Sequence, residues 1–325
     1  MRPSDDKRDP MMDFDKKGSE TARAAWLYYN EHLTQKEVAR ELNVSRSTVT
    51  RLLQRAEIEG LVHISLNVTA STFKAERELE SAYGLQKARI VPDSNDEATQ
   101  KRWLCLRAAE LMVGMVAEGA IVAVSWGTTM QAMADSLVGQ HPTAATQIVA
   151  LNGGLHNASQ GTNTYEVAKQ FGRYLNAPAR VLHAPVYVKD EATAMGLASD
   201  PGIRDALDVA RKASIVIYSL GAMHDESTML KLGHITSEQE GFLREHGAVG
   251  EIACRWIDRN GKTVQLPTSI NPIGISLDDL RKIPQRLAVA GGKLKQEVVL
   301  AALRGGFVTT LVTDERAAAY LLENR

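Results

Sequence analysis

A short run of hydrogen-bond donors, SRSTVTR at residues 45–51, is the first part of this sequence whose residue types suggest chemistry. Hydroxyl and guanidinium groups donate hydrogen bonds to phosphate oxygens and to the edges of nucleic-acid bases. If a helix begins at Ser45, the dipole of that helix also favours anions at the same end. The run therefore predicts contact with a polyanion through Ser45, Arg46, Ser47, Thr48, Thr50 and Arg51.

The residues before this run predict a helix that packs against it. In TQKEVARELNV, Thr34 can act as N-cap, and Val38 and Leu42 are spaced to lie on one helix face. Asn43 then falls in a turn of about three residues, where asparagine tolerates a left-handed backbone. A helix pair with such a turn is typical of the helix-turn-helix. We therefore add Gln35, at the start of the first helix, to the residues expected to contact double-stranded DNA.

Segments on either side extend this predicted DNA-binding domain. Residues 20–31 predict a third helix, and residues 60–68, GLVHISLNV, predict a turn and a strand that would form the wing of a winged helix-turn-helix. Alternatively, the arginines are solvated surface charges on a helical hairpin with a purely structural use. DNA binding is the favoured interpretation because the donors gather at the N-terminal end of one helix. The packing face expected for the third helix comprises Ala22, Ala25, Trp26 and Tyr29.

Charge and composition limit the classes to which the chain can belong. The 38 lysine and arginine residues are balanced by 39 aspartate and glutamate residues, so nucleic-acid binding would depend on a local patch. With only Cys105 and Cys254, neither a disulfide framework nor a zinc cluster is expected. No apolar run approaches the roughly 18 residues of a membrane span, and the charged N-terminus has no signal region. We expect a cytoplasmic protein with no membrane partner.

The length of 325 residues suits a small domain followed by a large one. We expect a disordered leader at residues 1–18, the helix-turn-helix domain at 19–67, a linker helix at 68–84 and an effector and oligomerisation domain at 85–325. In the last part, strand, glycine-bearing loop and helix recur, which predicts a Rossmann-like α/β domain with a largely parallel sheet. Asn-Gly at residues 260–261 lies between apolar flanks and predicts a hairpin, and hence some antiparallel pairing.

Three loops after predicted strands are candidates for a ligand site, because ligands collect at the carboxyl ends of parallel strands. The first loop precedes a helix and offers hydroxyls and N–H groups to a phosphate. The glycines of the second allow close backbone approach, although a tight turn explains them equally well. The lysines of the third oppose a helix dipole and suggest a bound anion, with solvated lysines as the alternative. The loop residues are Ser125, Gly127, Thr128 and Thr129, then Asn152, Gly153 and Gly154, then Lys293 and Lys295.

No constellation for catalysis emerges from the sequence. The 8 histidines are scattered, and His63, His156, His183 and His234 lack the spacing of metal ligands. Neither a nucleophile elbow nor a dinucleotide-binding glycine motif is present. We therefore expect no cofactor, no metal and no enzymatic activity.

Four segments carry a resemblance to a known family: AWLYYNEHLTQKEVARELNVSRSTVTRLLQRAEIEGLV, SWGTTM, GAVGEI and RLAVAGGKLKQEVVLAALRGGFVTTLVTDERAAAYLL. Over residues 20–323 the chain resembles the SorC-type family of sugar-binding transcriptional regulators, named after the sorbitol operon regulator. The resemblance implies an effector domain similar to sugar-phosphate isomerases and deaminases, retained as a sensor of a phosphorylated sugar. It also implies a homo-oligomer, a dimer or tetramer, that binds paired operator sites and releases or rearranges when the effector binds.

By position, the resemblance assigns roles to three residues. Thr129 matches a phosphate-contacting position, Glu251 an acidic residue that accepts sugar hydroxyls, and Lys295 a ligand-contacting lysine. Many family members have aspartate where Glu251 stands, and the longer side chain changes the shape of the sugar site. We predict a regulator of a sugar or polyol catabolic operon, with repression and activation both open. The alternatives are an enzyme similar to sugar-phosphate isomerases or deaminases, and an architectural DNA-binding protein without a sensor.

Overall fold

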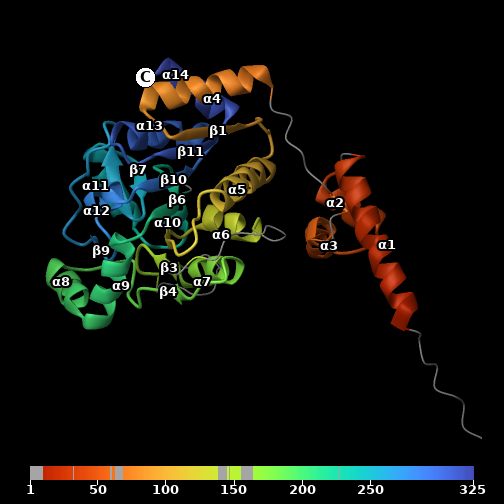
Figure 1. Cartoon of the computed structure of the whole chain (residues 1–325), viewed down its shortest axis with the longest axis horizontal. Helices are drawn as coiled ribbons and strands as arrows, with labels where there is room; N and C mark the ends of the chain where they lie inside the picture. Colours follow the sequence, from red (N-terminus) through yellow and green to blue (C-terminus); the bar gives the residue numbers. More distant parts are fainter. Residues whose placement is uncertain are drawn as a thin grey trace, which may run out of the picture. The chain divides into compact units, whose positions relative to one another are not determined.

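The computed structural model describes residues 10–31, 33–58, 61–62, 69–137, 145, 147–154, 164–225 and 227–325. The chain divides into two compact units, Met1–Asn67 and Val68–Arg325 (Figure 1). Within the described ranges, no helix combines the length and the apolar character needed to span a membrane.

The described part of the first unit holds the helices α1 (Pro10–Tyr29), α2 (Gln35–Glu41) and α3 (Arg46–Ile58). Both predicted N-caps form. Thr34 shares a capping box with Glu37, and the Ser45 hydroxyl accepts the Thr48 N–H at 3.1 Å. Asn43 takes the left-handed conformation expected of the turn, with φ at 54°. The helices enclose a core of Ala24, Val38, Ala39, Val49 and Leu53.

The structure corrects the sequence prediction at the N-terminal end of this unit. Helix α1 begins at Pro10, so residues 10–18 are helical where the sequence predicts a disordered leader, because a long helix readily extends through charged residues and methionine. Its predicted packing face is half right, since Ala25 is buried and Tyr29 packs against the core, whereas Ala22 and Trp26 are exposed and Ala24 is buried instead. A helix turns by about 100° per residue, so a small phase error moves the face. Of the predicted wing, only residues 61–62 lie among the described residues.

The second unit is built on a sheet with the strand order β1-β11-β10-β6-β2-β3-β4, in which all these neighbours pair in parallel (Figure 1). Strand β7 pairs with β6 and β8 with β7, both antiparallel, and β5 pairs with β9 in a separate small sheet. The predicted Rossmann-like α/β fold is confirmed. The strand bounds are β1 (Lys87–Val91), β2 (Ile121–Val124), β3 (Gln147–Ala150), β4 (Ala179–Arg180), β5 (Tyr187–Val188), β6 (Ile215–Ala222), β7 (Ala248–Ile252), β8 (Arg255–Asp258), β9 (Asn271–Pro272), β10 (Gln285–Val289) and β11 (Thr310–Asp314).

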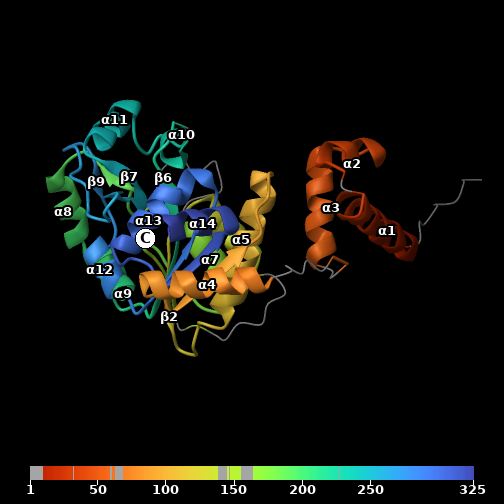
Figure 2. The ribbon, with the colours of Figure 1, turned by 90° about the horizontal axis from the view of Figure 1, so that it is seen from above.

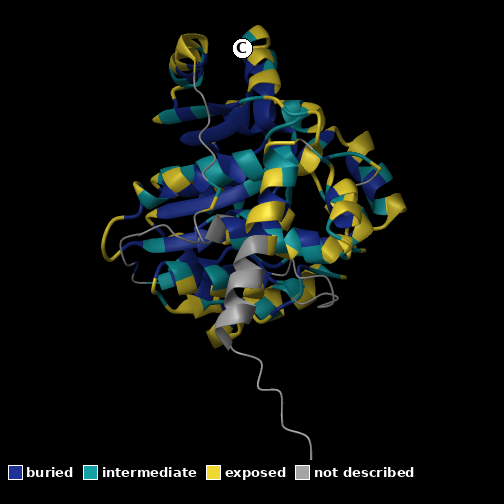
Figure 3. Ribbon diagram, turned by 90° about the vertical axis from the view of Figure 1, so that its right-hand side faces the viewer, coloured by how far each residue is buried: buried dark blue, intermediate teal, exposed yellow. Residues whose placement is uncertain are grey.

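Helices connect most of these strands and leave the central strands of the sheet buried, whereas β4, β5 and β9 are only partly covered (Figure 3). The predicted hairpin after β8 forms, with Gly261 at φ 75° and its N–H on the Asp258 carbonyl. The helix bounds are α4 (Ala70–Tyr83), α5 (Glu97–Val113), α6 (Thr128–Asp135), α7 (Thr164–Tyr174), α8 (Glu191–Ser199), α9 (Pro201–Arg211), α10 (Thr228–Lys231), α11 (Ser237–Glu245), α12 (Leu277–Lys282), the 3₁₀ helix η2 (Lys293–Lys295), α13 (Gln296–Arg304) and α14 (Glu315–Glu323).

The strand order reverses once between neighbours β2 and β6. From β2 the chain proceeds through β3 to β4 at one edge, and it then returns to β6 and proceeds through β10 to β11 on the other side. At such a switch point the two following loops diverge and leave a crevice at the carboxyl ends of the strands. The fold therefore places the best ligand position after residues 124 and 217, where β2 and β6 end their pairing.

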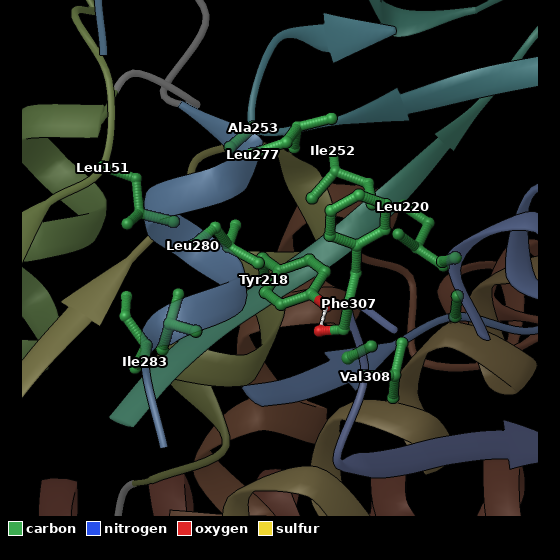
Figure 4. Close-up of a cluster of buried hydrophobic side chains, with 14 of the residues drawn as sticks. Leu151, Tyr218, Leu220, Ile252, Ala253, Leu277, Leu280, Ile283, Phe307 and Val308 are labelled. Atoms are coloured by element: carbon green, nitrogen blue, oxygen red, sulfur yellow. Dashed lines mark hydrogen bonds between the residues drawn. The ribbon is translucent and has the colours of Figure 1, made fainter. Parts of the chain in front are cut away.

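A cluster of buried side chains fixes β6 at this position (Figure 4). Tyr218 is fully buried, and its hydroxyl donates to the Phe307 carbonyl at 2.6 Å. Leu220, Ile252 and Leu280 belong to the same cluster. Leaving a buried hydroxyl unpaired costs about 1–3 kcal/mol, so this bond stabilises the segment before β11 against β6.

Helix α4 belongs to the second unit, although the sequence predicts a linker. It packs on the edge strand β1 and on α14 (Figures 1 and 2). The Glu80 carboxylate accepts the Ala88 N–H, and the Glu76 carboxylate accepts the Ile90 N–H, each at 3.0 Å. Arg89 lies between them, 3.3 Å from Glu76 and 3.7 Å from Glu80. Two carboxylates one helix turn apart therefore satisfy N–H groups that an edge strand would otherwise leave open.

Candidate functional site

The loop after β2 reaches the crevice first. Ser125 is 2% exposed, and its N–H donates to the Ile217 carbonyl of β6 at 3.0 Å. Gly127 takes φ 108°, a conformation that L side chains rarely adopt, and it begins α6 without a side-chain cap in the described structure. The first N–H groups of α6, from Thr128 and the buried Thr129, are therefore free to bind an anion.

Lys101 contacts this helix start, and Lys295, from a distant part of the chain, lies close enough to Lys101 to interact with its charge. Lys101 of α5 donates from Nζ to the Thr128 hydroxyl at 3.2 Å. Lys295 ends η2, in the loop after β10, and is partly buried. Burial lowers the pKa of the Lys295 ammonium, and the positive charge of Lys101 lowers that pKa further. The two cations repel each other beside an open helix N-terminus. A bound anion would stabilise this arrangement because it attracts both cations and the helix dipole.

Lys101 is the site residue that the sequence does not reveal. It lies within α5, without a glycine loop or any motif around it, and 27 residues before Thr128. Its place follows only from the contact of α5 with α6. Lys293, two residues before Lys295, is exposed and has the character of a solvated lysine.

Glu251 of β7 forms a second, buried part of the site. It is 8% exposed and lies opposite Gly221 of β6, where any side chain would clash with the carboxylate. One carboxylate oxygen accepts the Cys254 N–H at 2.7 Å. Burial raises the pKa of Glu251 to about 7, against the opposing effects of that N–H and of Lys295. The carboxyl group can thus be an acceptor when ionised and a donor when protonated.

Cys254 joins this carboxylate to two of the predicted loops. Its thiol accepts the Trp126 indole N–H at 3.1 Å and lies 3.5 Å from the amide nitrogen of Asn152. Its carbonyl accepts the Tyr187 hydroxyl at 2.9 Å. Burial raises the pKa of the Cys254 thiol well above its usual value, so the thiol stays protonated and acts as a packing and hydrogen-bonding group. The loops after β2 and β3 therefore meet Glu251 at one buried thiol.

The second predicted loop divides into one site residue and two packing residues. Asn152 is 1% exposed, and its Oδ1 atom has no hydrogen-bond partner among the described residues. The N–H groups of Gly153 and Gly154 donate to the carbonyls of Ile273 and Ala184, at 2.8 and 3.0 Å. We therefore revise the prediction for both glycines. Their close backbone approach is to the protein's own chain, because their donors are already used within the protein.

The predicted DNA-contacting residues lie together on the first unit. Ser45, Arg46, Ser47 and Arg51 are exposed, and Thr48 and Thr50 are partly exposed on the same helix α3. The Thr50 hydroxyl lies 3.3 Å from the amide oxygen of Gln35, which joins α3 to the start of α2. The hydroxyl of Ser45 lies 2.8 Å from those of both Ser47 and Thr48. One end of α3 thus presents hydroxyl and guanidinium groups to solvent.

Comparison with known proteins accounts for both units. Residues 68–323 match Sugar-bind, a family of sugar-binding domains. The chain belongs to the Sugar-bind family. Residues 24–68 match the MarR family, which agrees with the helix-turn-helix seen in α2 and α3. The resemblance to SorC-type regulators is therefore confirmed, and this member of the family is a helix-turn-helix transcriptional regulator with a sugar-binding domain.

Relatives of this Sugar-bind member are themselves named as regulators. The chain is 33% identical over 306 residues to the transcriptional regulator YjhU of Escherichia coli K12, covering 92% of this chain and 93% of that protein. It is 31% identical over 303 residues to the deoxyribonucleoside regulator of Bacillus subtilis, covering 93% and 96%. The full-length sorbitol operon regulator SorC from Klebsiella pneumoniae shares the fold, with TM-score 0.71, 23% identity and coverage of 95% and 99%.

Proposed function

We propose that this regulator controls a carbohydrate catabolic operon, binding operator DNA through α3 and a phosphorylated sugar through the second unit. The observation that supports the effector class is the pair of interacting lysines beside the uncapped start of α6: Lys101 contacts Thr128, and Lys295 interacts with the charge of Lys101. A phosphate dianion would neutralise the repulsion between the lysines and accept the free N–H groups. A neutral sugar would not neutralise the charge of either lysine.

The buried part of the site supports a polyhydroxylated effector rather than a bare anion. Glu251 offers a carboxylate, and Asn152 offers an amide oxygen with no partner in the described structure. Both groups accept hydrogen bonds from hydroxyls, and both belong to segments that meet at Cys254. A ligand with a phosphate at one end and hydroxyls at the other matches this division.

Titration calorimetry with a phosphorylated sugar and its unphosphorylated parent tests the effector class. A panel of phosphopentoses and aminosugar phosphates first identifies a ligand by thermal shift. We then expect Lys295→Ala to weaken binding of the phosphate ester by roughly 1.5–3 kcal/mol, the range of a charge-assisted hydrogen bond. Operator binding in the absence of effector should be unchanged. Lys293→Ala is the matched control, because Lys293 is exposed in the same turn. Equal affinity for ester and parent sugar would refute the phosphate site.

An enzymatic function is the second candidate, and the pKa of Glu251 near 7 is the observation that favours it. A general acid or base works best with a pKa near the operating pH. We propose that the protein is nevertheless a sensor without turnover, since its relatives are named as regulators. Incubation with the same panel, followed by product analysis, distinguishes the two. Product formed at a rate that Glu251→Gln abolishes would establish catalysis.

A homo-oligomer, a dimer or tetramer, completes the proposal. One helix-turn-helix reads a half-site, so a two-fold operator calls for at least two copies. Analytical ultracentrifugation at micromolar concentration, with and without operator DNA, checks this. A monomer under both conditions would contradict it.

A further inference from the structure

Asp314 connects the anion site to helix α14. This residue ends β11, is 1% exposed and acts as the N-cap of α14, accepting the Ala317 N–H at 2.8 Å. Its other carboxylate oxygen accepts the N–H of Gly292, immediately before η2. One buried carboxylate therefore holds both the start of α14 and the loop that carries Lys295.

The two glycines of this loop are explained by the same carboxylate. A side chain at Gly291 would clash with the Asp314 carboxylate, and Gly292 takes φ 87°. Gln296 adds a second link, because its amide donates to the Arg316 carbonyl of α14 at 3.1 Å. The Lys295 loop is thus tied to the first turn of α14 at two points.

The same turn of α14 also contacts the segment that leads to Lys101. The Arg316 N–H donates to Asp93 at 3.1 Å, and the Arg316 guanidinium lies 3.5 Å from that carboxylate. Gln100, the neighbour of Lys101, binds residues 92–94 through its side-chain amide. Its oxygen accepts the Ser94 N–H at 2.6 Å, and its nitrogen donates to the Pro92 carbonyl at 3.1 Å. Both lysine-bearing segments therefore meet the N-terminus of one helix.

The opposite end of α14 is held by α4. The Tyr83 hydroxyl donates to the Leu321 carbonyl at 2.6 Å. Leu321 lies in the last turn of α14, where carbonyls have no partner within the helix. A helix of 9 residues is about 13 Å long and behaves as a rigid body, so a shift at one end is carried to the other. Helix α4 follows directly in sequence from the DNA-binding unit.

We propose that α14 is a strut that links occupancy of the anion site to α4, with Asp314 as the positioning residue at the site end and Tyr83 as the contact at the other. This proposal rests on the proposed anion site. An anion that draws Lys101 and Lys295 together changes the two loops bound to the first turn of α14. The helix transmits this change to α4 through the Tyr83 hydroxyl. The signal thereby reaches α4, the first helix of the second unit, which follows the DNA-binding unit in sequence.

Residue-resolved hydrogen exchange of the full chain, with inorganic phosphate as the probe, tests the strut. In the wild type, saturating phosphate should slow exchange by about fivefold, the lower end of ordinary coupling, in residues 292–296, 314–318 and 79–84. In Tyr83→Phe, the first two segments should respond as before while residues 79–84 lose most of their response. Tyr320→Phe is the matched control, since it removes a hydroxyl from α14 itself and should preserve all three responses.

Each other result rejects a definite step. If residues 292–296 and 314–318 respond in the wild type and residues 79–84 do not, the strut is wrong and the anion site stands. If Tyr83→Phe keeps the full response of residues 79–84, the route through Tyr83 is wrong. If none of the three segments responds to phosphate, the anion site itself fails, and the strut fails with it.

Discussion

Helices α3 and α6 both present their N-termini to an anion, yet they do so in opposite ways. In α3 the Ser45 hydroxyl caps the Thr48 N–H, and the exposed side chains of Arg46 and Arg51 remain for contact. In α6 Gly127 provides no cap, and the N–H groups stay open beside lysines held by surrounding structure. The first arrangement suits a large polyanion reached by flexible side chains. The second suits a small anion enclosed by fixed groups.

The largest effect should come from removing the flexible donors of α3. We expect Arg46→Ala and Arg51→Ala each to cost roughly 1–3 kcal/mol of operator affinity if they read bases, with effector binding unchanged. Arginines that contact only phosphates would instead weaken all DNA sequences alike and reduce the salt slope by about one each. Electrophoretic mobility shift or fluorescence anisotropy at several salt concentrations measures both quantities. Full-strength binding by the double variant would remove α3 from the interface.

Effector binding at the site beside α6 should depend on pH, whereas DNA binding by α3 should not. The pKa of Glu251 is raised to about 7, so its carboxylate is mostly ionised above pH 8 and mostly protonated below pH 6. If sugar hydroxyls require the ionised form, effector affinity falls by about tenfold from pH 8 to pH 6. The phosphate also titrates near pH 6. Calorimetry with Glu251→Gln removes the contribution of Glu251 and leaves the pH dependence due to the ligand and to Lys295, whose pKa is lowered. An identical pH profile for both proteins would contradict the assignment of Glu251.

The smallest expected effect concerns the caps themselves. Ser45→Ala should lower the stability of the first unit by about 1 kcal/mol, because the Thr48 N–H loses its acceptor. Thr128→Ala should leave thermal stability within about 0.5 kcal/mol and weaken effector binding, since the hydroxyl holds Lys101 rather than the helix start. Thermal denaturation with and without effector compares the two variants. The comparison between the helices fails if Thr128→Ala is the more destabilising of the two.

The sequence was sufficient to predict structural features that depend on a local pattern. The caps at Thr34 and Ser45 and the left-handed Asn43 belong to neighbouring residues, and the structure has all of them. The β2 loop was selected as a candidate because a glycine and hydroxyls directly follow a strand, and its contact with an effector stays a prediction. Such signals are contained in a few consecutive residues, so a local pattern is enough to detect them.

The rest of the site depends on strand order, which the local pattern does not specify. Lys101 meets Lys295 only because α5 packs beside α6 and β10 lies two strands from β2. The prediction that Gly153 and Gly154 contact the effector was revised because a local pattern does not show which group approaches a glycine. A glycine in the sequence indicates that some group approaches closely. Only the structure shows that this group is the backbone of Ala184 and Pro185 at Gly153 and Thr164 at Gly154.

The carboxylates of Glu76 and Glu80 have a practical consequence for isolating the second unit. They cover the open edge of β1 by binding the N–H groups of Ala88 and Ile90. A fragment that starts at residue 85, where the sequence places the domain boundary, would lose this cover and present a bare strand to other molecules. Exposed edge strands of this kind template aggregation. A fragment that starts at residue 68 should stay dispersed at concentrations where the shorter one precipitates, and light scattering of the two would show it.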